Sequence, residues 1–169
     1  MNTKIRFFVD PMCAWCWAMK PTMQKMIEQV DSKAEIELIM GGMRVRGNTK
    51  KIEGDYKYYL KQVFDRVTNM SGQTMNMSVL ETNDLYFDSE NSCKAVVEIR
   101  KQLGTAAAIE YLHKIQAAYF IDGKNITKSD VLAELAGDGF TDNVEEFLTA
   151  ITSEDNEKQA FQEFKFVQQ

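Results

Sequence analysis

The stretch FVDPMCAWCW, residues 8–17, decides the fold of this chain because it joins a strand pattern to a helix pattern through two cysteines. Residues 4–10 (KIRFFVD) form a run rich in β-branched and aromatic side chains that a proline ends, which predicts a buried strand. Residues 16–30 carry apolar side chains at the spacing of a helix with one buried face. Cys13 and Cys16 are therefore predicted to lie at a strand-to-helix junction.

A second strand pattern follows this helix. Within residues 34–40 (AEIELIM), apolar side chains recur at every second position, at Ile36, Leu38 and Met40, and the pair Gly41-Gly42 follows. Pro21 lies inside the helical pattern, so we expect a kink or the start of a second helical segment there. A strand, a helix and a strand in this order predict a β-α-β unit with parallel strands.

Helical patterns dominate the rest of the chain. Gly104 divides one long pattern into two, and Thr127 with Asp130 forms a T-x-x-D capping signal. Thr141 and Ser153 precede acidic residues, as is typical of helix N-termini. The predicted helices span residues 56–70, 91–104, 105–123, 127–139, 141–152 and 153–169, with a loop over 70–78.

Composition bounds the class of protein. The chain has 169 residues, which suits one domain, with 44% hydrophobic and 27% charged residues. Its net charge of −5 argues against nucleic acid or an anionic membrane as the main partner. The sequence shows no signal-peptide pattern and no apolar run of membrane-spanning length. We therefore expect a cytoplasmic protein, while a mature secreted chain that has lost its signal stays open.

Two cysteines three residues apart at a helix N-terminus suit redox chemistry. The unpaired N–H groups and the helix dipole favour a thiolate at Cys13. Cys16 lies on the same helix face and can resolve a mixed disulfide. The odd total of three cysteines disfavours a structural disulfide framework. Trp17 is expected to pack in the core, whereas Trp15 suits packing and a platform for a bound peptide equally.

The pattern D-P-x-C-x-W-C-W over residues 10–17 resembles the DsbA-like thioredoxin-fold thiol–disulfide oxidoreductases, in particular the cytoplasmic DsbA-like group that includes the FrnE-type proteins. Further segments fall in the order of that group, and the resemblance covers most of the chain. These segments are GGMRVRG (41–47), SGQTM (71–75), YFDSENSCKAV (86–96) and AAYFIDGKNITKSDVLAELA (117–136).

The resemblance implies an α/β thioredoxin-like fold with an inserted all-helical domain. It divides the chain into a β-α-β unit over 1–48, a helical insertion over 49–152 and a returning helix over 153–169. It implies Cys13 as the nucleophile and Cys16 as the resolving cysteine, with Pro11 and Trp15 expected to contact the substrate. That substrate is expected to be a cysteine-containing protein or peptide, or a small dithiol, with no cofactor. Oxidation, reduction and isomerisation of disulfides all stay open.

The prolines depart from the family pattern. Thioredoxin-fold oxidoreductases hold a cis-proline opposite the cysteine pair, but the only prolines here are Pro11 and Pro21. We therefore expect the C-terminal β-hairpin and final helix of the thioredoxin half to be missing from this chain. An open sheet edge of this kind predicts a homodimer or marginal stability.

Other interpretations of the cysteines remain open. Cys13, Cys16, Cys93 and His113 together form a Cys₃His set that suits structural zinc. Taken alone, Cys93 is expected to be a small buried residue on a helix, and His113 a surface or partly buried one. A non-catalytic binding or scaffold protein is a further alternative. A relative of the glutathione-dependent isomerases is less favoured, because these usually lack the second cysteine.

Overall fold

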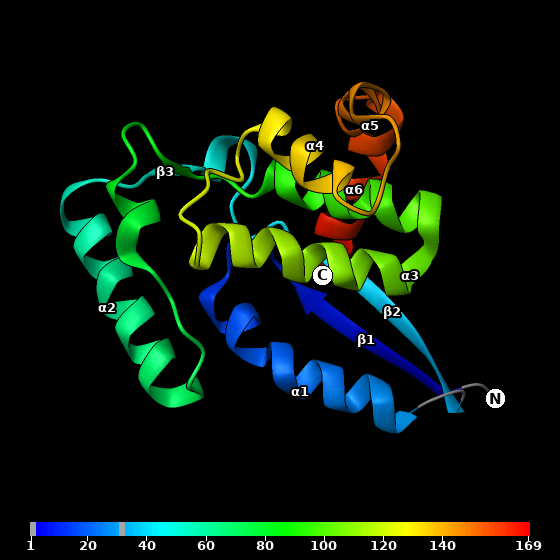
Figure 1. Cartoon of the computed structure of the whole chain (residues 1–169), viewed down its shortest axis with the longest axis horizontal. Coiled ribbons are helices and arrows are strands. Elements are labelled where there is room, and N and C mark those ends of the chain that lie inside the picture. Colours follow the sequence, from blue (N-terminus) through cyan, green and yellow to red (C-terminus); the bar gives the residue numbers. More distant parts are fainter. Residues whose placement is uncertain (1–2, 31–32) are drawn as a thin grey trace.

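The computed structural model describes residues 3–30 and 33–169. Strands β1 (Thr3–Val9) and β2 (Ala34–Met40) pair in parallel, from Thr3 opposite Ala34 to Val9 opposite Met40. Helix α1 (Ala14–Val30) connects them and lies along one side of the pair (Figure 1). The predicted β-α-β unit is confirmed. Among the described residues, no further strand joins this sheet.

Helix α1 runs through Pro21 without starting a second segment, contrary to one of the two expectations. A proline removes one backbone donor, and the turns around it stay helical when packing holds them. Trp17 on one side of Pro21 and Met23 on the other are both buried in the core. Tertiary packing therefore outweighs the local cost of the proline.

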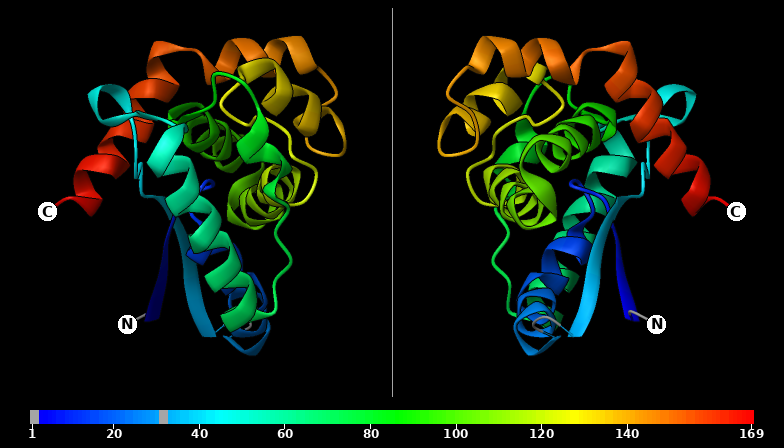
Figure 2. Two further views of the ribbon diagram at one scale, coloured as in Figure 1. Left: turned by 90° about the vertical axis from the view of Figure 1, so that its left-hand side faces the viewer. Right: turned by 90° about the vertical axis from the view of Figure 1, so that its right-hand side faces the viewer.

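The helical part follows the predicted pattern closely. Gly104 has φ 88° and ψ 177°, which interrupts α3 and confirms the predicted division at this glycine. α3 lies against β2, and α2 packs beside α1 (Figures 1 and 2). The helices are α2 (Gly54–Ser71), α3 (Glu90–Phe120), α4 (Ser129–Gly137), α5 (Val144–Ile151) and α6 (Glu154–Val167).

The predicted cap at Thr127 is wrong. α4 begins after Lys128, and the Thr127 backbone N–H and hydroxyl both donate to Asn125 Oδ1, at 3.0 and 2.7 Å. A local turn therefore competes successfully for the side chain that the pattern assigned to the helix. Ser153 caps α6 as predicted, by accepting a hydrogen bond from the Asn156 N–H.

Four short elements carry no periodic pattern, and the sequence did not predict them. Two-residue strands and single 3₁₀ turns are too short to show a period of 2 or 3.6. β3 and β4 pair in antiparallel fashion. The elements are η2 (Arg46–Asn48), β3 (Lys50–Lys51), η3 (Met77–Glu81) and β4 (Tyr86–Phe87).

A partly buried ion pair joins β2 to two helices. Arg100 on α3 donates to Glu163 on α6 and to the Leu38 carbonyl. Glu163 also accepts from the Met40 N–H at 2.7 Å. The end of β2 is therefore tied to α3 and α6 together. No helix among the described residues combines the length and apolarity that crossing a membrane requires.

Candidate functional site

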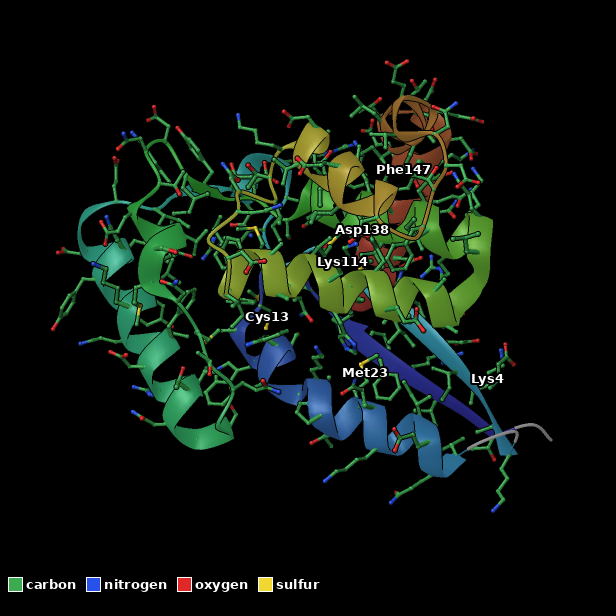
Figure 3. All side chains as sticks on the ribbon, in the orientation of Figure 1. Lys4, Cys13, Met23, Lys114, Asp138 and Phe147 are labelled. Carbon is green, nitrogen blue, oxygen red and sulfur yellow. The ribbon has the colours of Figure 1, made fainter. Side chains whose placement is uncertain are left out.

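Cys13 occupies the cap position of α1, where the chain leaves β1 (Figure 3). Its N–H donates to the Asp10 carbonyl at 3.1 Å, and its own carbonyl accepts the first helical bond from Trp17 N–H at 3.1 Å. The Cys16 N–H donates to Cys13 Sγ at 3.4 Å. Both thiols are half-buried and free. The sulfur of Cys13 thus receives a backbone donor from the first turn of the helix.

The two thiols differ in acidity because one donates to the other. The hydrogen bond from the Cys16 thiol is the largest influence on Cys13 and lowers its pKa to about 7. Burial and the charge of Asp10 act in the opposite direction, and N–H groups of the helix turn add to the lowering. The same hydrogen bond, together with burial, raises the pKa of Cys16. Cys13 is therefore the more acidic thiol of the pair, and Cys16 the less acidic one.

Asp10 is almost completely buried and fixes the loop that carries the cysteines through hydrogen bonds. Its Oδ1 accepts from the Met12 N–H at 2.9 Å, while Oδ2 accepts from the Met43 N–H at 2.8 Å and the Ser89 hydroxyl at 2.6 Å. Burial raises the pKa of Asp10, and these hydrogen bonds oppose that rise. One carboxylate therefore joins the cysteine loop, the loop after β2 and the start of α3.

The proposed zinc ligands do not form a metal site. Cys93 is buried on α3, with its thiol 3.9 Å from Asp10 Oδ2 and its pKa raised by burial. His113 is buried as well, and burial followed by the charge of Lys20 lowers its pKa to about 4. Within the part of the chain that the structure describes, no three His, Cys, Asp or Glu side chains group as metal ligands would.

The two tryptophans occupy different environments. The Trp17 ring is buried against Phe120, with centroids 6.0 Å apart, and its Nε1 donates to the Thr74 carbonyl, so core packing is confirmed. Trp15 is 46% exposed beside Cys13. Pro11 is buried and does not line the cavity described next.

A cavity of about 480 Å³ opens next to Cys13, between the start of α1, α2 and the loop after β2. Its volume suits a small ligand. A second cavity of about 630 Å³, between β2, α3 and α6, contains no cysteine. The side chains that line the first cavity include Trp15, Arg44, Asn48, Tyr56, Tyr59 and Arg66.

Sequence patterns did not predict most of the residues that line the cavity beside Cys13. Residues 44–66 carry no motif, and their distance from Cys13 along the chain hides their proximity in space. The GGMRVRG segment was singled out only as a resemblance to a known turn. The one available signal was a surplus of aromatic and basic residues at the start of α2.

A family model described as Thioredoxin matches residues 7–167. A candidate protein disulfide isomerase from Nitrosomonas europaea superposes with a TM-score of 0.85 at 18% identity, covering 99% of this chain and 79% of that one. The cytosolic disulfide reductase DsbM from Pseudomonas aeruginosa superposes with a TM-score of 0.80 at 23% identity, covering 98% and 76%. DsbM has also been solved with GSH.

Sequence relatives carry a different name. The ClpXP adapter protein SpxH of Bacillus subtilis is 26% identical over 144 residues, which are 85% of this chain and 46% of SpxH. The chain thus spans about half the length of the curated relatives that it matches. Because the family model covers nearly all of the residues and the solved structures share the arrangement of the helices, this chain belongs to the thioredoxin family and has the DsbA-like fold, a thioredoxin-like unit with an inserted helical domain.

Proposed function

We propose that this protein is a thiol–disulfide oxidoreductase in which Cys13 is the nucleophile and Cys16 the resolving cysteine. The observation that carries the proposal is the asymmetric pair at the start of α1. Cys13 Sγ accepts a hydrogen bond from the Cys16 backbone N–H at 3.4 Å, its pKa is lowered while that of Cys16 is raised, and Cys13 lines an open cavity. A stabilised thiolate beside a protonated partner is the arrangement that disulfide exchange requires.

The exchange proceeds in two displacements. The Cys13 thiolate attacks a substrate disulfide, which forms a Cys13–substrate disulfide and releases one substrate thiolate. Cys16 then loses its proton and attacks Cys13 Sγ, which releases the second substrate thiolate and leaves a Cys13–Cys16 disulfide. The enzyme has given up two electrons, and an external dithiol returns them. The reverse sequence oxidises a substrate dithiol.

Reduction in the cytoplasm is the direction that we favour. DsbM is described as a cytosolic disulfide reductase, and its structure with GSH makes a small thiol a candidate substrate beside a cysteine-containing protein. Trp15, exposed next to Cys13, would contact that substrate. Pro11, a buried residue of the loop itself, would act by fixing the loop rather than through direct contact.

Insulin reduction by dithiothreitol tests the proposal. The unaltered chain is expected to accelerate the reaction, and Cys13→Ser is expected to abolish the acceleration. Cys16→Ser should accumulate a mixed disulfide with insulin, visible by mass, because the resolving thiol is gone. Cys93→Ala, which changes a buried thiol outside the cavity, is the matched control and should keep the activity. Equal turnover by Cys13→Ser and the unaltered chain would reject the proposal.

The similarity to SpxH favours a second candidate, a binding role that needs no thiol chemistry. An adapter function should survive in a Cys13→Ser/Cys16→Ser variant, whereas an oxidoreductase function should not. The two candidates are separated by testing whether this double variant restores the phenotype of a strain that lacks the gene for this protein.

A further inference from the structure

We propose that the cavity beside Cys13 selects low-molecular-weight disulfides that carry carboxylates, and that Arg44 and Arg66 make this selection. The inference rests on the proposed function and names the class of substrate.

The pairing of the arginines is the first observation. Arg6, Arg46 and Arg100 each form an ion pair with a glutamate. Within residues 3–30 and 33–169, Arg44 and Arg66 form none, and both line the cavity that contains Cys13. The chain has 25 acidic and 20 basic residues, so carboxylate partners are plentiful elsewhere on it. Neither arginine has an ion-pair partner among the residues described, and no described aspartate or glutamate lines this cavity.

The second observation is that Arg44 is held in place. Its Nη1 donates to both the carbonyl and the side-chain oxygen of Asn48, at 3.2 Å each. The guanidinium lies 5.8 Å from the centroid of Tyr56, and the Arg44 carbonyl accepts from the Ser89 N–H at 2.9 Å. A fixed guanidinium with donors to spare recognises a carboxylate at a small entropic cost, often through two parallel hydrogen bonds.

Lys50 adds a positive charge next to one of the aromatic rings that line the cavity. The Lys50 ammonium lies 4.0 Å from the centroid of the Tyr56 ring, which lines the cavity. Asp10 does not line the cavity, and its buried carboxylate already accepts from the Met12 N–H, the Met43 N–H and the Ser89 hydroxyl. A cavity with positive walls concentrates anionic substrates and raises their rate of encounter. The aromatic rings of Trp15 and Tyr59 offer contact to the uncharged part of the substrate.

Three small disulfides of similar size and different charge test the selection. They are dithiodiglycolate (two carboxylates), bis(2-hydroxyethyl) disulfide (neutral) and cystamine (two ammonium groups), each reduced with dithiothreitol as the electron donor. For the unaltered chain, kcat/KM is expected to fall from the anionic to the neutral to the cationic disulfide. Arg44→Gln and Arg66→Gln should each lower the anionic-to-neutral ratio of kcat/KM by about tenfold, the effect of one charge-assisted contact. Added salt should lower the same ratio in the unaltered chain.

Controls keep the outcome interpretable. Lys25→Gln removes one positive charge from an exposed position of α1, about 18 Å along the helix from Cys13, and should leave the ratio as it is. Arg66 is exposed, so its variant tests selection even where Arg44→Gln lowers the melting temperature. Equal kcat/KM for the three disulfides, or an unchanged ratio in both arginine variants, would overturn the selection alone. If the unaltered chain reduces none of the three disulfides faster than Cys13→Ser does, the proposed function is rejected instead.

Discussion

The reactivity of Cys13 depends on one neighbouring thiol. We predict that native Cys13 reacts with iodoacetamide with a midpoint near pH 7, below which protonation slows the reaction. Cys16→Ala removes the donor with the largest effect on Cys13, so the midpoint should move up toward the ordinary value of 9.0. Mass-mapped alkylation across pH measures both values.

Cys93→Ala is the control for this shift and should leave the Cys13 midpoint in place. Cys93 itself should label last, since its thiol is buried and its pKa is raised. An unchanged midpoint in Cys16→Ala, or first labelling at Cys93, would contradict this account of the pair.

Asp10 is predicted to stabilise the fold through the three N–H and O–H groups that donate to it. Asp10→Ala leaves the Met12 and Met43 N–H groups and the Ser89 hydroxyl without their acceptor. Because unsatisfied buried donors cost about 1–3 kcal/mol each, we expect a loss of about 3 kcal/mol in the free energy of unfolding. Urea denaturation measures it. Ser89→Ala removes one of the three donors and should cost about 1 kcal/mol; equal losses would argue against Asp10 as the shared acceptor.

Between elements, Gly42 sets the distance of α6 from the end of β2. Gly42 has φ 56°, and a Cβ built on it would overlap the Phe164 ring of α6. Gly104 also has a positive φ, 88°, but a Cβ there would meet open space. Gly104→Ala should therefore cost about 1–3 kcal/mol from backbone strain alone. Gly42→Ala adds steric overlap to its strain and should cost more.

A double-mutant cycle separates these two causes. Phe164→Leu should recover part of the loss in the Gly42→Ala background, since it removes the overlapping ring. The same change should add independently to Gly104→Ala, where no contact exists. The free energies of unfolding of the four proteins in each cycle give its coupling energy, and additivity in both cycles would show that Phe164 does not limit position 42.

At the level of the whole fold, Glu163 joins parts that lie far apart in sequence. Glu163→Ala removes the partner of both Arg100 and the Met40 N–H, so we expect a loss of about 3 kcal/mol, as for other partly buried charges left unpaired. Glu157→Ala on the same helix breaks only the exposed pair with Arg46 and should cost less than about 1 kcal/mol. Equal melting temperatures of the two variants would contradict this ranking.

The homodimer inferred from the open sheet edge stays a prediction that sedimentation can test.

The local pattern of the sequence was enough to predict the β-α-β unit, the break at Gly104, the Ser153 cap and the position of the cysteine pair. Each of these depends on periodicity, a dihedral preference or a neighbour within a few residues. The failures at Pro21 and Thr127 arose where packing or a competing turn outweighed a local preference. In both cases the deciding contacts lie outside the motif.

The site beyond the cysteines was decided by tertiary structure. Asp10 meets Met43 and Ser89 across 33 and 79 positions of sequence, and Arg44 and Arg66 reach the Cys13 cavity from a loop and a helix that carry no motif. Such contacts depend on how α2 and α3 pack on the β-α-β unit, which no local pattern encodes. The sequence alone therefore predicted which thiol is the candidate nucleophile, and the packing of the helices determined what surrounds that thiol, because the charged and polar groups around it are ones that only the folded chain brings together.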